Sequence, residues 1–371
     1  MKNVFKKVTA CLLIFIFTVF MAIPVNALSD LESLNKTVKE EKLLLGDKNI
    51  SWIDNKDNST EYFYGKEYGA DNYYKITWDG QATLVANPYS DTTQPAFPTL
   101  PVAGGKTYTT TVGQDGASID IKSNTGDTFN IPMSKLATSI TGNPISGSGT
   151  ATPGQTVADV IVLGELDGEV YFAIKSNGKY YLVTGQGELF YNTPIEGADG
   201  TNVVIGYVTA GRGVVLVKGA TGAKVISFDG NEIASGDDIS VSRFGFIGVE
   251  YKDTASDGST QKHTKVLSFE GTTLLAGRTG QLAHYVASTV HEDNTSSDYL
   301  KDGSHIFTVV DPYTSTTCHY KLVITSTNNP APNPENPSTA TGQGEMTLTL
   351  TVAALAVGAI YIASRKLKRD F

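Results

Sequence analysis

The sequence predicts an all-β protein, and three observations lead to that prediction. From residue 49 onward, short segments rich in Val, Ile, Tyr, Phe and Thr alternate with Gly, Asn and Asp, a composition typical of strands and turns. Long stretches of helical periodicity are missing from the same region. A seven-residue pattern also recurs along the chain, as it does in folds that are built from repeated units.

The recurring pattern is a short strand that ends in a glycine turn. Residues 224–230, Lys-Val-Ile-Ser-Phe-Asp-Gly, return 41 positions later as residues 265–271, Lys-Val-Leu-Ser-Phe-Glu-Gly, with weaker copies at 74–80 and 181–187. A spacing near 40 residues, with about four short strands per unit, is typical of a β-propeller blade, and about six units fit the chain. We expect propeller-like blades, clearest over residues 165–327, and tandem β-sandwich domains remain the alternative.

The chain opens with the features of a secretory signal peptide. Lysines precede an apolar run over residues 8–23, and small residues follow at Val25 and Ala27. This order predicts a signal helix within residues 1–27 and cleavage after Ala27.

Two further elements are expected in the exported region, which we place at residues 28–327. Leucine and valine recur at helical spacing over residues 28–41, behind a Ser-Asp cap, so a short helix is predicted there. Residues 170–175 and 179–184 flank Asn177-Gly178, the dipeptide that supplies the positive φ angles of a two-residue hairpin turn.

The C-terminal end combines a spacer, an apolar run and a basic tail. Residues 328–345 are rich in proline and asparagine, which predicts an extended spacer. The run over residues 346–364 holds 19 residues without a formal charge, and as a helix it spans about 29 Å, close to a bilayer core. Four cations in residues 365–371 would hold the tail in the cytoplasm, so the preceding chain faces outward.

The spacer contains a pentapeptide that matters because of its place before this run. It reads Asn336, Pro337, Ser338, Thr339 and Ala340. The order of pentapeptide, apolar span and basic tail resembles the cell-wall sorting signal of sortase-anchored Gram-positive surface proteins. The family pattern is Leu-Pro-any-Thr-Gly, so Pro337 and Thr339 match, whereas Asn336 stands for Leu and Ala340 for Gly.

The resemblance implies cleavage after Thr339 and transfer of its acyl group to the cell wall. Sortase, acting on this chain as a substrate, and peptidoglycan are then the implied partners, and the membrane holds the chain before processing. A single-pass anchor that is never cut remains the alternative.

Charge and cysteine content exclude some classes of protein. After cleavage at Ala27 and at Thr339, the exported chain keeps 22 Lys and Arg against 36 Asp and Glu, a net charge near −14. This balance argues against binding nucleic acid through bulk charge. Cys318 is the one cysteine left after the signal peptide is removed, so no internal disulfide forms, and we expect a buried core thiol.

Aromatic residues cluster in the first part of the exported region. Exposed rings bind the faces of sugars or peptides, so they form a possible ligand platform, although alternating aromatics also pack sheets. The candidates are Tyr62, Tyr64, Tyr68, Tyr73 and Trp78.

Catalytic and metal-binding signatures are weak. The five histidines lie between His263 and His319, and the His-, Asp- and Glu-bearing loop at 291–305 matches neither zinc nor calcium spacing, so no metal and no cofactor is expected. We find no nucleophile elbow, zinc-protease or dinucleotide motif.

These observations together favour a secreted, wall-anchored surface protein. Its all-β region would act as a non-catalytic binding or adhesion module for a glycan or for a host or matrix protein. The alternatives are a wall-anchored extracellular glycan hydrolase, whose paired carboxylates need not be close in sequence, and a purely structural wall protein.

Overall fold

The structure is a computed structural model that describes residues 31, 34–45, 48–89, 106–136, 152–157, 160–196, 203–219, 222–242, 244–254, 258–289 and 299–327. Its contacts divide the chain into two compact units, Met1–Thr327 and Asn328–Phe371, and every described residue belongs to the first unit. The predicted all-β class is confirmed, because the described residues form 23 strands and one 3-10 helix, η1 (Met133–Lys135).

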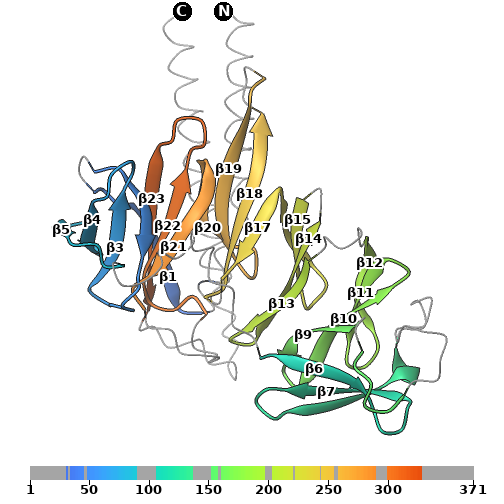
Figure 1. Ribbon diagram of the computed structural model, residues 1–371. Coiled ribbons are helices and arrows are strands. Elements are labelled where there is room, and N and C mark those ends of the chain that lie inside the picture. Colours follow the sequence, from blue (N-terminus) through green and yellow to red (C-terminus); the bar gives the residue numbers. More distant parts are fainter. Residues whose placement is uncertain are drawn as a thin grey trace, which may run out of the picture. The chain divides into compact units, whose positions relative to one another are not determined.

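The strands form six antiparallel sheets, which we number in chain order (Figure 1). The first sheet contains β2 (Ile50–Asp54), β3 (Tyr62–Glu67), β4 (Tyr73–Thr77) and β5 (Ala82–Val85). The second contains β6 (Tyr108–Val112), β7 (Ser118–Ser123) and β8 (Thr128–Pro132). The third contains β9 (Val160–Leu166), β10 (Glu169–Ser176), β11 (Lys179–Thr184) and β12 (Leu189–Glu196).

The remaining strands form three four-stranded sheets. The fourth sheet contains β13 (Val203–Thr209), β14 (Arg212–Gly219), β15 (Gly222–Ser227) and β16 (Glu232–Gly236). The fifth contains β17 (Asp238–Val241), β18 (Phe246–Thr254), β19 (Thr260–Ser268) and β20 (Thr273–Thr279). The sixth, the closing sheet, contains β21 (Gln281–Ala287), β22 (Gly303–Val310), β23 (Thr317–Ser326) and, from the other end of the region, β1 (Lys36–Lys42).

Strand β1 corrects the helix predicted over residues 28–41. It pairs antiparallel with β23 from Lys36, opposite Ser326, to Lys42, opposite Tyr320. The helical spacing of Leu31, Leu34 and Val38 is a local signal only, and the ladder offered by β23 overrides it. The partner strand lies far along the chain, so nearby residues could not reveal it.

Asp302 fixes the beginning of β1 to the end of β23. The carboxylate accepts hydrogen bonds from Lys36 Nζ at 2.5 Å and from the amide and hydroxyl of Ser326, each at 3.0 Å. Thr327 N donates to Asn35 O at 2.6 Å just beyond the ladder. The first and last described strands are therefore held together by side chains as well as by the backbone.

The repeated sequence pattern is the strand that leads into one recurrent turn. In the fourth sheet, Gly230 N donates to Ser227 O at 2.9 Å, Ser227 N donates to Asn231 O at 2.8 Å, and Ser227 Oγ accepts from Asn231 N at 3.1 Å. The same hydroxyl–glycine turn joins the third and fourth strands of the first, third, fourth and fifth sheets, and β7 to β8 in the second. The five turns are Thr77–Gly80, Ser123–Gly126, Thr184–Gly187, Ser227–Gly230 and Ser268–Gly271.

The turn requires glycine for two reasons. Gly230 has a φ of 83°, which side-chain-bearing residues rarely adopt. A Cβ on Gly230 would also lie 1.9 Å from Phe190 O of the preceding sheet, and one on Gly187 would lie 1.3 Å from Lys135 O. These two turns therefore press directly on the backbone of the preceding unit.

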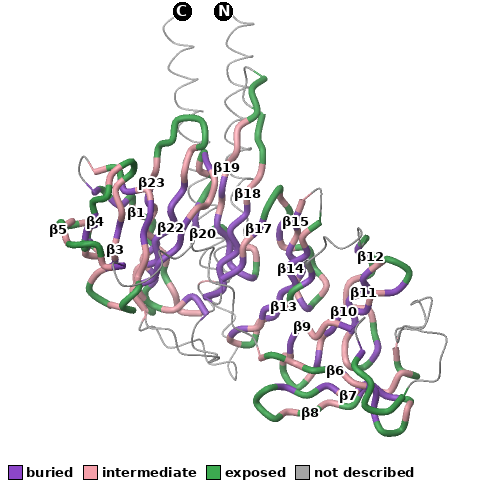
Figure 2. Tube along the Cα trace, in the orientation of Figure 1, coloured by how far each residue is buried: buried purple, intermediate pink, exposed green. Residues whose placement is uncertain are grey.

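Hydrophobic cores fill the contacts from the second sheet through to the closing sheet, and from the closing sheet to the first. Ile121 of the second sheet packs in one cluster with Phe172 of the third, whereas the neighbouring Ala173 packs in another with Val215 of the fourth. A larger cluster joins the fourth, fifth and closing sheets, and a further one joins the closing sheet to the first. The third sheet thus buries both faces, and the buried residues follow its strands and those of the fourth sheet (Figure 2).

The predicted hairpin is confirmed. Strands β10 and β11 pair from Ser176 opposite Lys179, and Asn177 and Gly178 have φ angles of 51° and 76°. Two positive φ values in succession define the primed turn that the Asn-Gly dipeptide favours.

Candidate functional site

The structure separates the five candidate ligand aromatics into three groups. Tyr62 and Tyr64 alternate along β3 and share the outer face of the first sheet with Tyr73, because Tyr73 pairs with Lys66 of that same face. Trp78 lies on the opposite side, where its ring packs 4.9 Å from Phe63 within the contact to the closing sheet. Tyr68, which is 58% exposed, lies beyond the end of β3.

Two aromatic residues that were not singled out from the sequence complete this outer face. The Tyr89 ring lies 5.0 Å from Trp52, 6.1 Å from Tyr73 and 6.4 Å from Tyr64. Trp52, Tyr73 and Tyr89 form a small separate core, with 4%, 2% and 5% of their surfaces exposed. Trp52 alternates with Asp54 on β2, and this alternation could have placed Trp52 on the outer face from the sequence. Tyr89 follows β5 outside any strand, so no such pattern was available for it.

Two carboxylates hold the tyrosine hydroxyls in place. Tyr62 and Tyr64 both donate to Asp57 Oδ2, at 2.9 and 2.8 Å, and Tyr89 donates to Asp54 Oδ2 at 2.7 Å. The hydrogen bond from Tyr64 holds the pKa of Asp57 below its ordinary value. Burial, aided by the bond to Asp57, raises the pKa of Tyr64, so at neutral pH Tyr64 donates and Asp57 is ionised.

Cations border the same face. Lys75 Nζ lies 3.6 Å from the centre of the Tyr62 ring, and Lys66 Nζ lies 5.1 Å from that of Tyr73. Lys56 Nζ lies 3.4 Å from Asp57 Oδ1. We call the set of Asp57, Tyr62, Tyr64 and Lys75 the tyrosine–aspartate face. It combines half-buried rings, an ionised carboxylate and an exposed ammonium group, which suits stacking together with hydrogen bonding.

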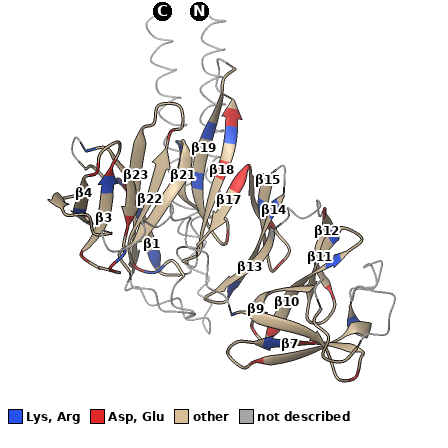
Figure 3. Cartoon of the chain, viewed as in Figure 1, with Lys and Arg blue, Asp and Glu red and all other residues tan. Residues whose placement is uncertain are grey.

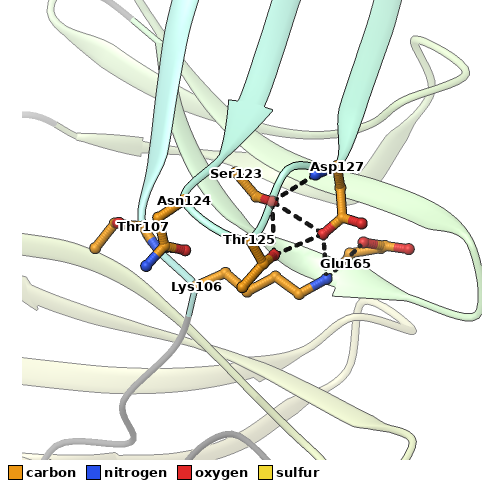
Figure 4. A network of polar contacts seen from close by, with 7 residues as sticks. All are labelled: Lys106, Thr107, Ser123, Asn124, Thr125, Asp127 and Glu165. Atoms are coloured by element: carbon orange, nitrogen blue, oxygen red, sulfur yellow. Dashed lines mark hydrogen bonds and ion pairs between the residues drawn. The ribbon is translucent and has the colours of Figure 1, made fainter.

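Some charged residues elsewhere join neighbouring sheets, whereas others pair within one sheet. Strand β18 carries both acidic and basic residues, whereas the charged residues of β19 are lysines (Figure 3). At the contact between the second and third sheets, Lys106 Nζ lies 2.7 Å from Asp127 and 3.4 Å from Glu165 (Figure 4). The bond from Lys106, with those from Thr125 and Ser123, lowers the pKa of Asp127 to about 2. This network fixes a turn to the neighbouring sheet and leaves its carboxylates occupied.

Glu250 is a carboxyl group whose pKa is raised, chiefly by burial. It lies directly opposite Asp238 in the pairing of β17 with β18. Its two oxygens accept from Leu282 N at 3.1 Å and from Gln281 Nε2 at 3.3 Å. The side chain therefore braces the fifth sheet against the closing sheet.

The histidines and Cys318 occupy structural positions. His284, His305 and His319 are buried in the closing sheet, and the predicted loop at 291–298 lies outside the described residues. No group of three or more His, Cys, Asp or Glu side chains within the described ranges is arranged to hold a metal ion. Cys318 is half-buried and forms no disulfide, rather than being fully buried as expected.

The predictions for both chain ends fall outside the described residues. They include the signal cleavage after Ala27, the pentapeptide at residues 336–340 and the apolar run at 346–364. Within the part of the chain that the structure describes, no helix has the length and apolarity needed to cross a bilayer.

No family model matches the chain, and no curated protein is similar to it. A streptogramin B lyase structure is 12% identical over 78% of this chain and 98% of its own, with a TM-score of 0.24. A virginiamycin B lyase from Staphylococcus aureus is 11% identical over 78% and 99%, with a TM-score of 0.21. A member of the DUF4221 family from Bacteroides vulgatus is 8% identical over 79% and 99%, with a TM-score of 0.23. TM-scores this low carry no argument about fold or activity, so the function has to be inferred from the chain itself.

Proposed function

We propose that this chain is a secreted, wall-anchored surface protein whose propeller-like head binds a glycan or protein ligand through the tyrosine–aspartate face. The observation that carries the binding role is the arrangement of Tyr62 and Tyr64 around Asp57 on a face that the first sheet does not use for packing against the closing sheet. The role is non-catalytic, because the face offers recognition groups rather than a nucleophile with an adjacent base.

The propeller-like head is supported by the way the sheets bury their faces. Each sheet of a β-sandwich buries one face and leaves the other to solvent, whereas a blade lies between two neighbours. Phe172 and Ala173 are adjacent on β10, yet they belong to the cores on opposite sides of the third sheet. The hydroxyl–glycine turn recurs at the matching position of successive sheets, which favours one repeated unit over unrelated domains.

Export and anchoring are supported by the two chain ends. The signal peptide with cleavage after Ala27 directs secretion, and the apolar run with its basic tail retains the chain at the membrane before processing. Sortase then cleaves after Thr339 and links the head to peptidoglycan. Replacing Thr339 by Ala moves the protein from the wall fraction to the membrane or medium; an unchanged wall fraction would contradict this step.

The binding role is tested on the full chain with glycan arrays and extracellular-matrix proteins. A Tyr62→Ala, Tyr64→Ala double variant loses at least about tenfold in affinity for any ligand detected, as expected when stacking and hydrogen-bonding groups are removed. Tyr313→Ala is the matched control, because Tyr313 is 69% exposed on the loop between β22 and β23. Equal loss in the control, or binding unchanged in the double variant, would exclude this face as the ligand site.

A second candidate function is glycan hydrolysis, favoured by one observation. Burial raises the pKa of Glu250, and Glu250 lies directly opposite Asp238 in the pairing of β17 with β18, so two carboxyl groups stand close together as glycoside hydrolysis requires. Hydrolysis of a polysaccharide panel that is lost in Glu250→Gln but kept in Glu232→Gln would favour the enzyme. Retention of activity in both variants, or its absence in the parent chain, would remove this candidate.

A further inference from the structure

Three of the five histidines lie on successive strands of one sheet. His284 is on β21, His305 on β22 and His319 on β23, and their exposed fractions are 1%, 0% and 5%. All three therefore belong to the closing sheet, which β1 completes from the other end of the region. All five histidines lie at or beyond residue 263, so the contacts among the second, third and fourth sheets contain none.

His284 and His319 lie in one row across the sheet, on the side that faces the first sheet. Thr308 of β22 stands between them, paired with His284 on one side and with His319 on the other. Thr308 Oγ1 and His319 Nδ1 are 2.8 Å apart, and His319 Nε2 is 2.9 Å from Ile50 O of the first sheet. The row thus ends in a hydrogen bond that crosses from one sheet to the next.

This bond fixes the tautomer of the neutral His319 ring, whereas burial is what disfavours its charged form. Because a carbonyl only accepts, Nε2 carries the proton that points to Ile50, and Nδ1 then accepts from the Thr308 hydroxyl. A second proton on the ring would reverse the Thr308 bond and would place a charge inside the apolar cluster formed with Val286 and Ile306.

The groups around the row do little to offset such a charge. Lys321 of β23 is a cation that pairs with Glu41 of β1 at 2.7 Å and donates to Trp78 O at 3.2 Å. Glu67 of β3 is occupied by Tyr74, whose hydroxyl donates to it at 3.1 Å. His305 faces the other side of the sheet, where Tyr285 and the Lys301 carbonyl bind its ring.

The pKa values agree with this geometry. Burial lowers the pKa of both His284 and His319 from 6.5 to about 4, and the charge of His319 further disfavours protonation of His284. The unfolded or opened chain therefore binds more protons than the packed one between pH 6.5 and about 4. Stability contributed by the two neutral rings is complete above 6.5 and is lost as the pH falls through that interval.

We propose that the contact between the closing sheet and the first sheet is an acid-sensitive latch. Protonation of the row formed by His284 and His319 releases the first sheet, and with it Trp78, before the contacts among the second, third and fourth sheets open. The latch is independent of the ligand proposed above, because none of its residues belongs to the tyrosine–aspartate face.

The chain carries its own probe for this opening. Trp52 lies on β2 of the first sheet and Trp78 in the turn between β4 and β5, where it packs against the core shared with the closing sheet; these are the two tryptophans of the chain. Trp52→Phe leaves Trp78 as the one indole, so its emission reports on this contact in the full chain. We expect a red shift as the pH falls from about 6.5 to about 4; constant emission across this range would overturn the proposal.

A second set of variants identifies the groups that titrate. In the Trp52→Phe background, adding both His284→Gln and His319→Gln lowers the midpoint of the red shift by at least about one pH unit, because glutamine takes no proton. His263→Gln is the control, since His263 is half-buried on β19 outside the row, and its midpoint stays unchanged. An equal shift in the control, or none in the double variant, would also overturn the proposal.

A measurement without histidine substitutions guards against variants that do not fold. Urea unfolding of the Trp52→Phe chain is followed by Trp78 emission at a series of pH values. The midpoint decreases between about pH 6.5 and pH 4, and the unfolding free energy falls with a slope that corresponds to the uptake of up to two protons. A midpoint independent of pH would contradict the latch regardless of how the variants behave.

Discussion

The fourth and first sheets have the same four-strand order and the same hydroxyl–glycine turn, but they use their faces differently. In the fourth sheet, Leu216 and Val215 are adjacent on β14, and each lies in a core on its own side. In the first sheet, Phe63 lies in the core with the closing sheet, whereas its neighbours Tyr62 and Tyr64 are half-buried and bind Asp57. The comparison teaches that the same four-strand unit can pack between two sheets, or can carry on one face tyrosines that bind carboxylates.

The strongest test of this comparison is truncation on the two faces. Phe63→Ala costs about 3–5 kcal/mol and Leu216→Ala about 2–5 kcal/mol of unfolding free energy, because both side chains are buried in cores. Tyr62→Ala costs less than about 1 kcal/mol, since its ring is only half-buried. Urea unfolding of the three variants measures these differences. A cost for Tyr62→Ala as large as that for Phe63→Ala would show that the outer face is core.

The shared turn is tested by adding one methyl group. Gly230→Ala places a Cβ 1.9 Å from Phe190 O, whereas Gly126, which has the same role in the second sheet, has no atom within 4 Å of such a Cβ. Both positions have positive φ, so Gly126→Ala costs about 1 kcal/mol and Gly230→Ala about 2 kcal/mol more. Thermal unfolding of the pair isolates the contact with the preceding sheet, and equal melting temperatures would argue against it.

Both ends of the region are joined at the closing sheet, and replacing Asp302 tests how much its side chain contributes to holding β1 on β23. Asp302→Asn removes the ion pair with Lys36 and weakens the bonds to Ser326, at a cost of about 1–2 kcal/mol. Amide exchange should rise in β1 while it stays unchanged in β14. Asp311→Asn is the control, because the Asp311 carboxylate accepts hydrogen bonds from its own loop, at Tyr313 and Thr314. Amide exchange in β1 of this variant should equal that of the parent chain.

The variant with the smallest expected effect on stability is Tyr64→Phe, which tests whether the tyrosine–aspartate face serves binding or folding. Tyr64→Phe removes one hydrogen bond to Asp57 and keeps the ring, so stability falls by about 1 kcal/mol or less. The variant should still lose affinity in the array that reveals a ligand. Unchanged affinity with a larger loss of stability would mean that the hydroxyl serves the fold alone.

Local sequence patterns predicted the strands and the repeated unit because these depend on neighbouring residues. The Asn177-Gly178 hairpin and the strands that end at Gly187, Gly230 and Gly271 are determined by alternation and turn chemistry within a few positions. The face on which Trp78 lies depends instead on how β4 pairs and on which sheet lies beside it, and this information is not local.

The same limit explains what was missed at the candidate site and at the beginning of the exported region. Tyr89 reaches Trp52 and Asp54 from a segment without periodicity, so no pattern assigned it to the face. Strand β1 was predicted as a helix because β23, which decides its conformation, lies far along the chain, where Ser326 pairs with Lys36 and Tyr320 with Lys42. Long-range pairing therefore decided the cases in which local signals were ambiguous or misleading.

The pairing of β1 with β23 also bears on how the protein is made. Strand β1 is synthesised first, yet it has no ladder until residues 317–326 have followed it. A product that stops short of residue 317 would lack the strand that lies between β22 and β1, and its charged first strand would stay loose and open to proteases. The closing sheet can therefore form only after β23 has been synthesised.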